Sequence, residues 1–253
     1  MGKIISNSKK KSIRSKNWLK IWEKKGHNLK NSKIEKIIEA DGFDSALGTF
    51  GKQNWFRYIK TIFSEIKIKK NSEILEYGCG AGAFLNFFYN KKYNLNGIDY
   101  SKSLIRKGKK YFPKIKFKCG ETTKIDSFDK KFDLICSHGV FHYFNNYHYA
   151  ESLIKRMLSN LKVNGFICIL DVPDKDKELI FKKRLINKIG IKEYKKKYGV
   201  YTHLFYKKSF FKALAKKNNL KIKIFNQNFK PYENSKYRYN IIFQKNLTKS
   251  CST

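Results

Sequence analysis

Long apolar runs are absent from this sequence of 253 residues. A membrane-spanning helix needs about 18 or more consecutive apolar residues. Residues 1–20, where a secretion signal would lie, carry many charges and no apolar core. We therefore expect neither a membrane span nor a secretion signal, and the cytoplasm is the expected location.

Cysteine is scarce and unclustered. The chain has five cysteines and none of them forms a C-x-x-C pair. Because zinc sites and disulfide frameworks need regularly spaced cysteines, we exclude both kinds of site. Four of the five fall in or beside predicted strands and are interpreted as reduced core residues: Cys79, Cys119, Cys136 and Cys168.

Arginine is rare although the chain is strongly basic. Lys and Arg number 56 against 20 Asp and Glu, a formal net charge of +36, yet only six of the basic residues are Arg. Base readout and bidentate phosphate contacts favour arginine, and the lysines are spread along the whole chain. We interpret them as a general surface feature and do not expect a nucleic-acid partner, with a polyanion partner as the alternative.

The chain is organised around the stretch Ile74 to Phe84, with the sequence ILEYGCGAGAF. Its apolar start predicts a buried strand, three alternate glycines follow, and residues 83–93 are predicted to form a helix. Glycine lets the backbone turn tightly, and a ligand can then lie close to the unpaired N–H groups at a helix start. The stretch therefore predicts a strand, turn and helix that cradle a nucleotide.

The glycines alone do not identify the nucleotide. Gly78, Gly80 and Ala83 also satisfy the dinucleotide pattern G-x-G-x-x-G/A. Glu76 separates the alternatives, because a carboxylate inside a buried strand is costly unless it is paired. A dinucleotide offers it no cation, whereas a cofactor with an ammonium group does. The pattern Glu76-x-Gly78-x-Gly80-x-Gly82 resembles the first motif of class I S-adenosylmethionine-dependent methyltransferases, of the bacterial small-molecule type.

The resemblance implies an α/β fold. We expect a Rossmann-like doubly wound sheet of about seven mostly parallel strands, with an antiparallel C-terminal hairpin and an N-terminal helical cap. The expected organisation is a mobile basic tail (1–15), a helical cap with a lid segment (16–68), the cofactor-binding domain (69–245, with an insert at about 174–207) and a second tail (246–253).

The same resemblance implies a set of cofactor-binding residues. Asp99 follows Gly78 by 21 residues at the end of the second predicted strand, where an acid binds the ribose hydroxyls. In the resembled family an acidic residue after the third strand faces the adenine amino group, and Glu121 matches it. The residues expected to contact S-adenosylmethionine are Glu76, Gly78, Cys79, Gly80, Gly82, Asp99, Tyr100, Ser101, Glu121, Thr122 and Ser137.

The loop after the fourth predicted strand contains the catalytic candidates. An alcohol or phenol must lose its proton during methyl transfer, and histidine is suited to accept it because its pKa lies near neutrality. His142 is the first choice and His138 the second. The alternative is that these histidines only line the cofactor pocket.

The acceptor is expected to meet aromatic and acidic side chains from several segments. They are a glycine-punctuated flap before the core, the loop after the fourth strand, the end of the fifth strand and the insert. The abundance of Phe and Tyr favours a small organic acceptor. No metal is predicted, because metal-assisted methylation needs converging acidic ligands and only Asp171 is well placed. The candidates are Phe43, Asp44, Tyr143, Asp171, His203 and Tyr206.

The leading hypothesis is a methyltransferase that acts on an oxygen, or secondarily a nitrogen, of a small metabolite or sugar-like intermediate. The strongly basic charge leaves an RNA- or protein-modifying methyltransferase as an alternative. DNA amino-methyltransferases carry Asn or Asp, then Pro-Pro and an aromatic residue, where this chain has residues 137–140, Ser-His-Gly-Val. An NAD-dependent oxidoreductase and a non-catalytic cofactor-binding subunit are the alternatives of a different class. The oligomeric state is not predicted.

Overall fold

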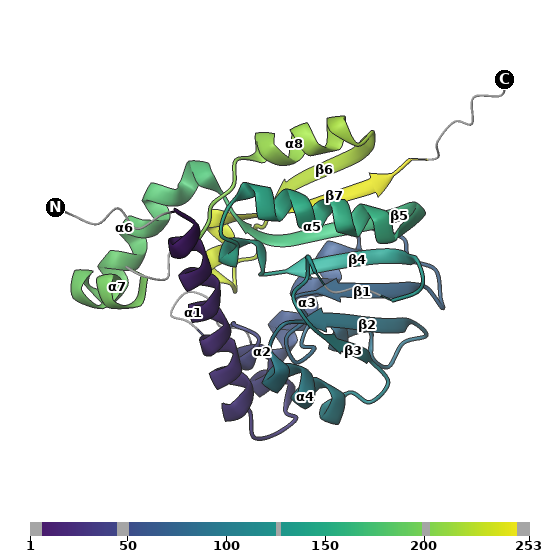
Figure 1. Ribbon diagram of the computed structural model, residues 1–253, viewed down its shortest axis with the longest axis horizontal. Helices are drawn as coiled ribbons and strands as arrows, with labels where there is room; N and C mark the ends of the chain where they lie inside the picture. The colour runs from purple at the N-terminus through teal and green to yellow at the C-terminus, as the bar shows by residue number, and fades with distance from the viewer. Residues whose placement is uncertain (1–6, 45–50, 125–127, 199–202, 247–253) are drawn as a thin grey trace.

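A seven-stranded sheet forms the centre of the computed structural model, which describes residues 7–44, 51–124, 128–198 and 203–246 (Figure 1). Within the described residues the strand order is β3-β2-β1-β4-β5-β7-β6. The strands are β1 (Glu73–Tyr77), β2 (Asn94–Asp99), β3 (Lys116–Cys119), β4 (Phe132–His138), β5 (Leu161–Pro173), β6 (Leu220–Asn226) and β7 (Arg238–Lys245).

The pairing of the strands confirms the predicted fold class. β1 to β5 pair in parallel, while β7 lies antiparallel between β5 and β6. Since β1 pairs with both β2 and β4, the strand order switches direction at β1. Ligands bind outside the carboxyl ends of parallel strands at such a switch. The functional site is therefore expected at the ends of β1, β2 and β4.

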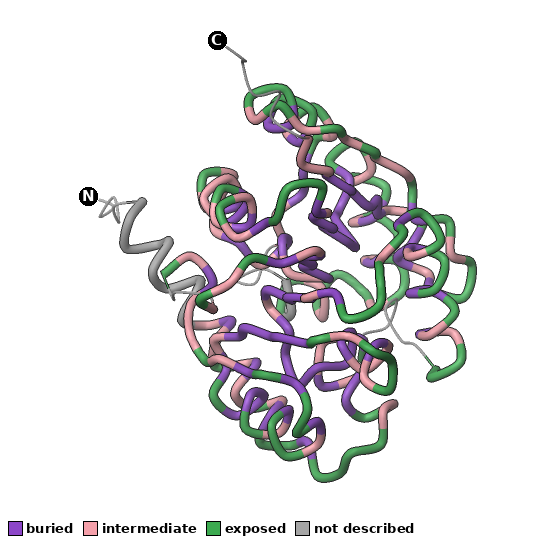
Figure 2. Tube along the Cα trace, turned by 90° about the vertical axis from the view of Figure 1, so that its right-hand side faces the viewer, coloured by how far each residue is buried: buried purple, intermediate pink, exposed green. Residues whose placement is uncertain are grey.

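Helices cover both faces of the sheet, and the buried residues gather along the strands (Figure 2). One apolar cluster packs the helices α1, α2, α3 and α4 against one face of the sheet, and a second cluster packs α5 and α8 against the other face. The described helices are α1 (Asn7–Asn28), α2 (Ile34–Ala40), α3 (Lys52–Phe63), α4 (Lys102–Tyr111), α5 (Tyr147–Asn160), α6 (Glu178–Ile189), α7 (Ile191–Tyr198) and α8 (Lys208–Lys217).

Helix α1 lies across the end of the sheet where β1, β2 and β4 finish (Figure 1). Its Glu23 carboxylate accepts hydrogen bonds from the backbone N–H groups of Lys102 and Ser103 at 2.6 and 3.2 Å, and so caps the start of α4. The sequence predicted a tail up to residue 15, but the helix already begins at Asn7. Lysine is a good helix former, which explains how the helix extends into the basic segment.

The helix expected over 83–93 is wrong. Only a short 3₁₀ helix, η1 (Leu85–Phe88), follows the glycine loop. Phe, Tyr and Asn, which fill this segment, have lower helix propensities than Leu or Lys. Its aromatic rings pack on α3 instead, with the Phe63 and Phe88 ring centroids 4.9 Å apart. Packing against α3 therefore takes the place of a regular helix.

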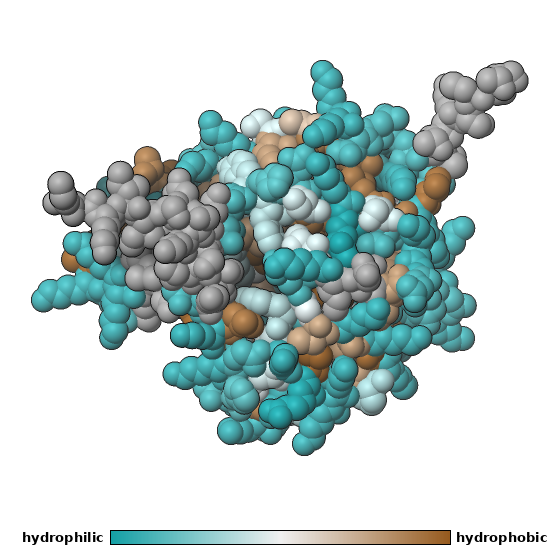
Figure 3. All heavy atoms as spheres, in the orientation of Figure 1, coloured by the Kyte–Doolittle hydropathy of each residue, from teal (hydrophilic) through white to brown (hydrophobic). Residues whose placement is uncertain are grey.

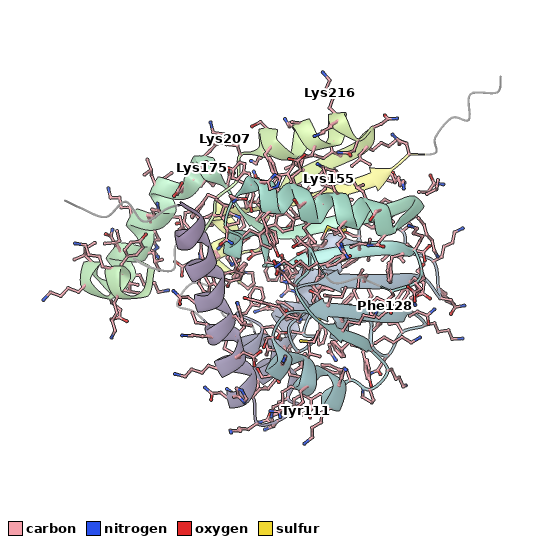
Figure 4. The ribbon with its side chains drawn as sticks, in the orientation of Figure 1. Tyr111, Phe128, Lys155, Lys175, Lys207 and Lys216 are labelled. Carbon is pink, nitrogen blue, oxygen red and sulfur yellow. The ribbon has the colours of Figure 1, made fainter. Side chains whose placement is uncertain are left out.

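The surface agrees with the spread of lysines in the sequence. Hydrophilic side chains cover most of the face in Figure 3, and the four lysines labelled in Figure 4 are all exposed. Among the described residues no helix has both the length and the apolar character to cross a membrane. Of the four described cysteines, all free, Cys119 is exposed, so its prediction as a core residue is wrong.

Candidate functional site

A cavity of about 360 Å³ lies at the carboxyl ends of β1, β2 and β4. One part of its lining comes from the glycine loop and the strand ends, and another from the N-terminal cap. The first group includes Glu76, Gly78, Cys79, Gly80, Asp99, Tyr100, Glu121 and Thr122. The second includes Trp18, Trp22, Asp41, Phe43 and Trp55, and the lining also contains His138 at the end of β4, Tyr143 and, from α5, Tyr149.

The glycine loop has the backbone that the sequence predicts. Gly78, Gly80 and Gly82 have φ angles of +77°, +54° and +97°, a region that other residues rarely adopt. Gly78 and Gly80 line the cavity, but Gly82 does not. A Cβ atom on Gly82 would lie 3.1 Å from Phe117, so this glycine serves the packing of the loop.

Asp99 holds the glycine loop beside the second strand. Its carboxylate accepts hydrogen bonds from the N–H of Gly80 at 3.0 Å and from the N–H of Ser101 at 2.8 Å. Burial raises the pKa of Asp99 to about 6. Ser101 itself caps α4, accepting from the N–H of Leu104 at 3.3 Å, and does not line the cavity.

Glu76 is a buried carboxylate that lacks compensation. It is 2% exposed, and its Oε2 atom has no hydrogen-bond partner among the described residues. Burial, with repulsion from Asp41 and Asp99, raises its pKa well above the ordinary value. No Lys or Arg is among the described residues that line the cavity. The acids Glu76, Asp41 and Asp99 therefore fit a ligand with a positive charge, such as the amino group of S-adenosylmethionine.

Asp41 lines the cavity and was not predicted from the sequence. Its carboxylate accepts hydrogen bonds from the N–H groups of Ala81 and Ala83 at 2.7 and 2.8 Å. Burial raises its pKa to about 7. The sequence predicts that Asp44 is the acid of the flap that contacts the acceptor. In the structure Asp44 is exposed, pairs with Lys25 at 2.5 Å and does not line the cavity. Residues 45–50 of the flap lie outside the described residues.

Glu121 and Thr122, the predicted residues after β3, both line the cavity. Glu121 accepts a hydrogen bond from the Tyr149 hydroxyl at 3.2 Å and pairs with Lys124 at 2.7 Å. Tyr149 comes from α5 and was not predicted, because its contact with Glu121 depends on how α5 packs.

His138 lies inside an aromatic stack. The Phe43 and Phe84 rings lie on it with centroids 5.1 and 5.2 Å away and interplanar angles of 11° and 22°. Its Nε2 atom is 3.2 Å from the Tyr58 hydroxyl, and the two share a hydrogen bond. Burial lowers the pKa of His138 to about 3. A histidine with such a low pKa is a poor proton acceptor, which argues against a catalytic role.

His142 is buried next to the cavity but does not line it. Its ring packs on Tyr143, which does line the cavity, with centroids 4.0 Å apart. The ring of His203, from the insert, packs on the rings of His142 and Trp18, with centroid distances of 4.6 and 5.8 Å. His142 and His203 thus gather around Tyr143, at the edge of the site.

Ser137, Asp171 and Tyr206 are further predicted residues that do not line the cavity. Ser137 is buried within β4. Asp171 accepts a hydrogen bond from the Tyr232 hydroxyl at 3.2 Å, and Tyr206 donates one to the carbonyl of Phe141 at 2.9 Å. In the part of the chain that the structure describes, no three His, Cys, Asp or Glu residues are grouped to hold a metal ion.

A family profile described as "Methyltransferase domain" matches residues 49–223 of the chain. Methyltransferase 235L of Invertebrate iridescent virus 6 is 24% identical over 147 residues, which cover 53% of this chain and 55% of that protein. Malonyl-[acyl-carrier protein] O-methyltransferase of Priestia megaterium is 31% identical over 96 residues, 36% of this chain and 34% of the other. The chain thus spans about half the length of the first of these curated relatives and less of the second.

Solved structures share the fold. Plantazolicin methyltransferase BpumL, in complex with a desmethylPZN analog and S-adenosylhomocysteine, has a TM-score of 0.60 at 19% identity, covering 92% of this chain and 99% of its own. Phosphoethanolamine N-methyltransferase 1 of Haemonchus contortus, with phosphoethanolamine and S-adenosylhomocysteine, has a TM-score of 0.63 at 12% identity, covering 95% of this chain and 50% of its own.

Proposed function

The chain belongs to the class I S-adenosylmethionine-dependent methyltransferases, and we propose that it methylates an oxygen atom of a small organic acceptor. The cofactor supplies an electrophilic methyl group on a positively charged sulfur. One observation carries the proposal: a single cavity joins a wall of carboxylates, suited to this cation, to a wall of aromatic rings.

The carboxylate wall supports a specific arrangement of the cofactor. Glu76, whose Oε2 atom has no partner among the described residues, would hold the amino group of the methionine part. Asp99 would accept hydrogen bonds from the ribose hydroxyls, while Glu121 and Thr122 would meet the adenine. Gly78, Cys79, Gly80 and Tyr100 line the same part of the cavity and would complete the contact. Gly82, Ser101 and Ser137 would support these residues rather than touch the ligand.

The aromatic wall supports a flat or apolar acceptor of small size. Trp18, Trp22, Phe43, Trp55 and Tyr143 all line the cavity. Methyl transfer from a sulfonium needs an aligned acceptor and little water, and large rings provide both conditions. Phe43 and Tyr143 are therefore the proposed acceptor contacts, with His203 at the margin. Asp44, Asp171 and Tyr206 are not proposed as contacts.

Proton removal favours an acidic acceptor oxygen. His138 has a pKa near 3 and is therefore a weak base. His142 does not line the cavity, so it would reach the acceptor only after Tyr143 moved. A phenol, with a pKa of about 10, needs less assistance than an alcohol. We therefore propose a phenol-like hydroxyl as the acceptor group and give His142 a secondary role.

A nitrogen acceptor is the second candidate. Four carboxylates, Asp41, Glu76, Asp99 and Glu121, line the cavity and would attract a cationic amine. The phosphoethanolamine N-methyltransferase that shares the fold is consistent with this candidate. An amine would still have to lose a proton before it reacted, which the pocket histidine does not assist.

The acceptor can be identified by supplying methyl-labelled S-adenosylmethionine with matched pairs of small aromatic compounds, each pair differing only in carrying a hydroxyl or an amino group. Labelled methyl ether is the expected product. Labelled methylamine would move the assignment to nitrogen. A protein that binds neither S-adenosylmethionine nor S-adenosylhomocysteine in calorimetry would refute the proposal as a whole.

A further inference from the structure

Every backbone N–H of the glycine loop from Gly78 to Ala83 already has an acceptor within the protein. Gly78 and Cys79 donate to the carbonyl of Ile98 at 2.7 and 3.1 Å, and Gly82 donates to that of Cys79 at 2.9 Å. The N–H groups of Gly80, Ala81 and Ala83 donate to carboxylates: Gly80 to Asp99, and both alanines to Asp41. Glycine loops bind phosphate through free N–H groups, and this loop has none to offer in the described structure.

Gly80 leaves room for a carboxylate of the protein itself. A Cβ atom on Gly80 would lie 2.2 Å from the Oδ1 atom of Asp41, far closer than two such atoms can approach. In dinucleotide-binding folds, the corresponding glycine allows the backbone to approach the pyrophosphate of the ligand. Here the space over the glycine holds Asp41, which arrives from the turn after α2.

This part of the cavity therefore presents carboxylates where a phosphate-binding loop presents N–H groups. Asp41 lines the cavity together with Glu76, and their mutual repulsion contributes to the raised pKa of Glu76. A phosphate placed here would meet two carboxylates in a site where charges are poorly screened. A cation placed here would relieve the repulsion between them.

We propose that Asp41 is a specificity residue, which closes the glycine loop to phosphate-bearing ligands and shares with Glu76 the binding of the cofactor's amino group. The inference rests on the proposed function for the identity of the cation. It also makes the N-terminal cap part of the cofactor site, although the glycine loop lies 40 residues later in the chain.

The test compares Asp41→Asn with Asp44→Asn, which removes the same charge from the same turn at an exposed position that does not line the cavity. Calorimetry would measure S-adenosylhomocysteine, ADP-ribose and adenosine with each protein. For Asp41→Asn we expect S-adenosylhomocysteine to bind about tenfold more weakly, ADP-ribose about tenfold more tightly and adenosine equally well. Asp44→Asn should match the wild type with all three ligands.

A second variant, Asp41→Ala, frees the N–H groups of Ala81 and Ala83 completely and should bind ADP-ribose at least as tightly as Asp41→Asn. Because a gain of binding does not arise from misfolding, this measurement remains decisive if the variants are less stable. If neither variant binds ADP-ribose more tightly than the wild type, the inference is overturned. Failure of the wild type to bind S-adenosylhomocysteine would instead contradict the proposed function, and the ADP-ribose comparison would still test Asp41.

Discussion

The two walls of the cavity differ in chemistry and in origin. The polar wall comes mainly from the ends of β1, β2 and β3, and backbone N–H groups fix the carboxylate of Asp99 in it. The aromatic wall is assembled from α1, the turn after α2, α3 and the loop after β4, and rings pack on rings. In the proposed function the polar wall would bind the cofactor, whereas the aromatic wall would select the acceptor. Substitutions in the two walls should therefore have separable effects.

Glu76→Gln should have the largest effect of the substitutions, and it should weaken cofactor binding without changing the aromatic wall. Losing a charged hydrogen bond costs about 2 kcal/mol, so S-adenosylhomocysteine should bind about 30-fold more weakly in calorimetry. The ligand-free protein should melt at the same temperature or higher, because the change removes the repulsion with Asp41 and Asp99. Unchanged affinity would show that the amino group binds elsewhere.

Phe43→Leu should affect the aromatic wall alone. The Phe43 ring contacts His138 and Trp55, with centroids 5.1 and 4.9 Å away, and it lines the cavity. We expect the KM for the acceptor to rise about tenfold, since ~1.4 kcal/mol of contact is lost, while S-adenosylhomocysteine binds within twofold of the wild type. Equal losses for acceptor and cofactor would contradict the separation of the two walls.

A rise in pH should strengthen cofactor binding and lower the stability of the ligand-free protein. Asp41, with a pKa of about 7, faces Glu76 and Asp99 from the strands and Lys25 from α1. As pH rises from 6 to 8 the carboxylates ionise, and S-adenosylhomocysteine should bind about fivefold more tightly. A carboxyl with a raised pKa stabilises the folded state below its unfolded pKa, and this stability is lost as pH rises through 7. The ligand-free protein should therefore melt lower at pH 8 than at pH 6.5.

The direction of the effect and one variant assign this pH dependence. His138, whose pKa burial lowers to about 3, makes the folded protein less stable as the pH falls through about 6.5, which is opposite to the effect of Asp41, so it does not account for a lower melting temperature at pH 8. Asp41→Asn should flatten both profiles between pH 6.5 and 8. An unchanged pH profile in that variant would assign the titration to another group.

The same contrast explains how far the sequence predicted the molecule. The family resemblance of residues 74–84 predicted the sheet, and Glu76, Gly78, Gly80 and Asp99 were expected in one site because they lie at or near the carboxyl ends of neighbouring strands of that fold, where they do line one cavity. Asp41 was missed because its hydrogen bonds to the glycine loop span 40 and 42 residues. No local pattern indicates which acid of the flap reaches the loop.

The sequence also did not predict how the catalytic candidates are buried. His138 is the last residue of β4 and His142 lies four residues later, close to the predicted loop, yet position in the chain does not determine burial. His138 is enclosed between two phenylalanine rings, one of them from the N-terminal cap, and loses its basicity for that reason. Only the packing of distant segments reveals this change.

His142→Ala should have the smallest effect. Because His142 lies behind Tyr143 and does not line the cavity, we expect turnover to fall less than about fivefold, well below the hundredfold or more that a general base contributes. His203→Ala, which removes the neighbouring ring of the same group, is the matched control and should behave alike. A hundredfold loss in His142→Ala alone, with cofactor affinity intact, would instead mean that Tyr143 moves aside during turnover and that His142 accepts the acceptor's proton.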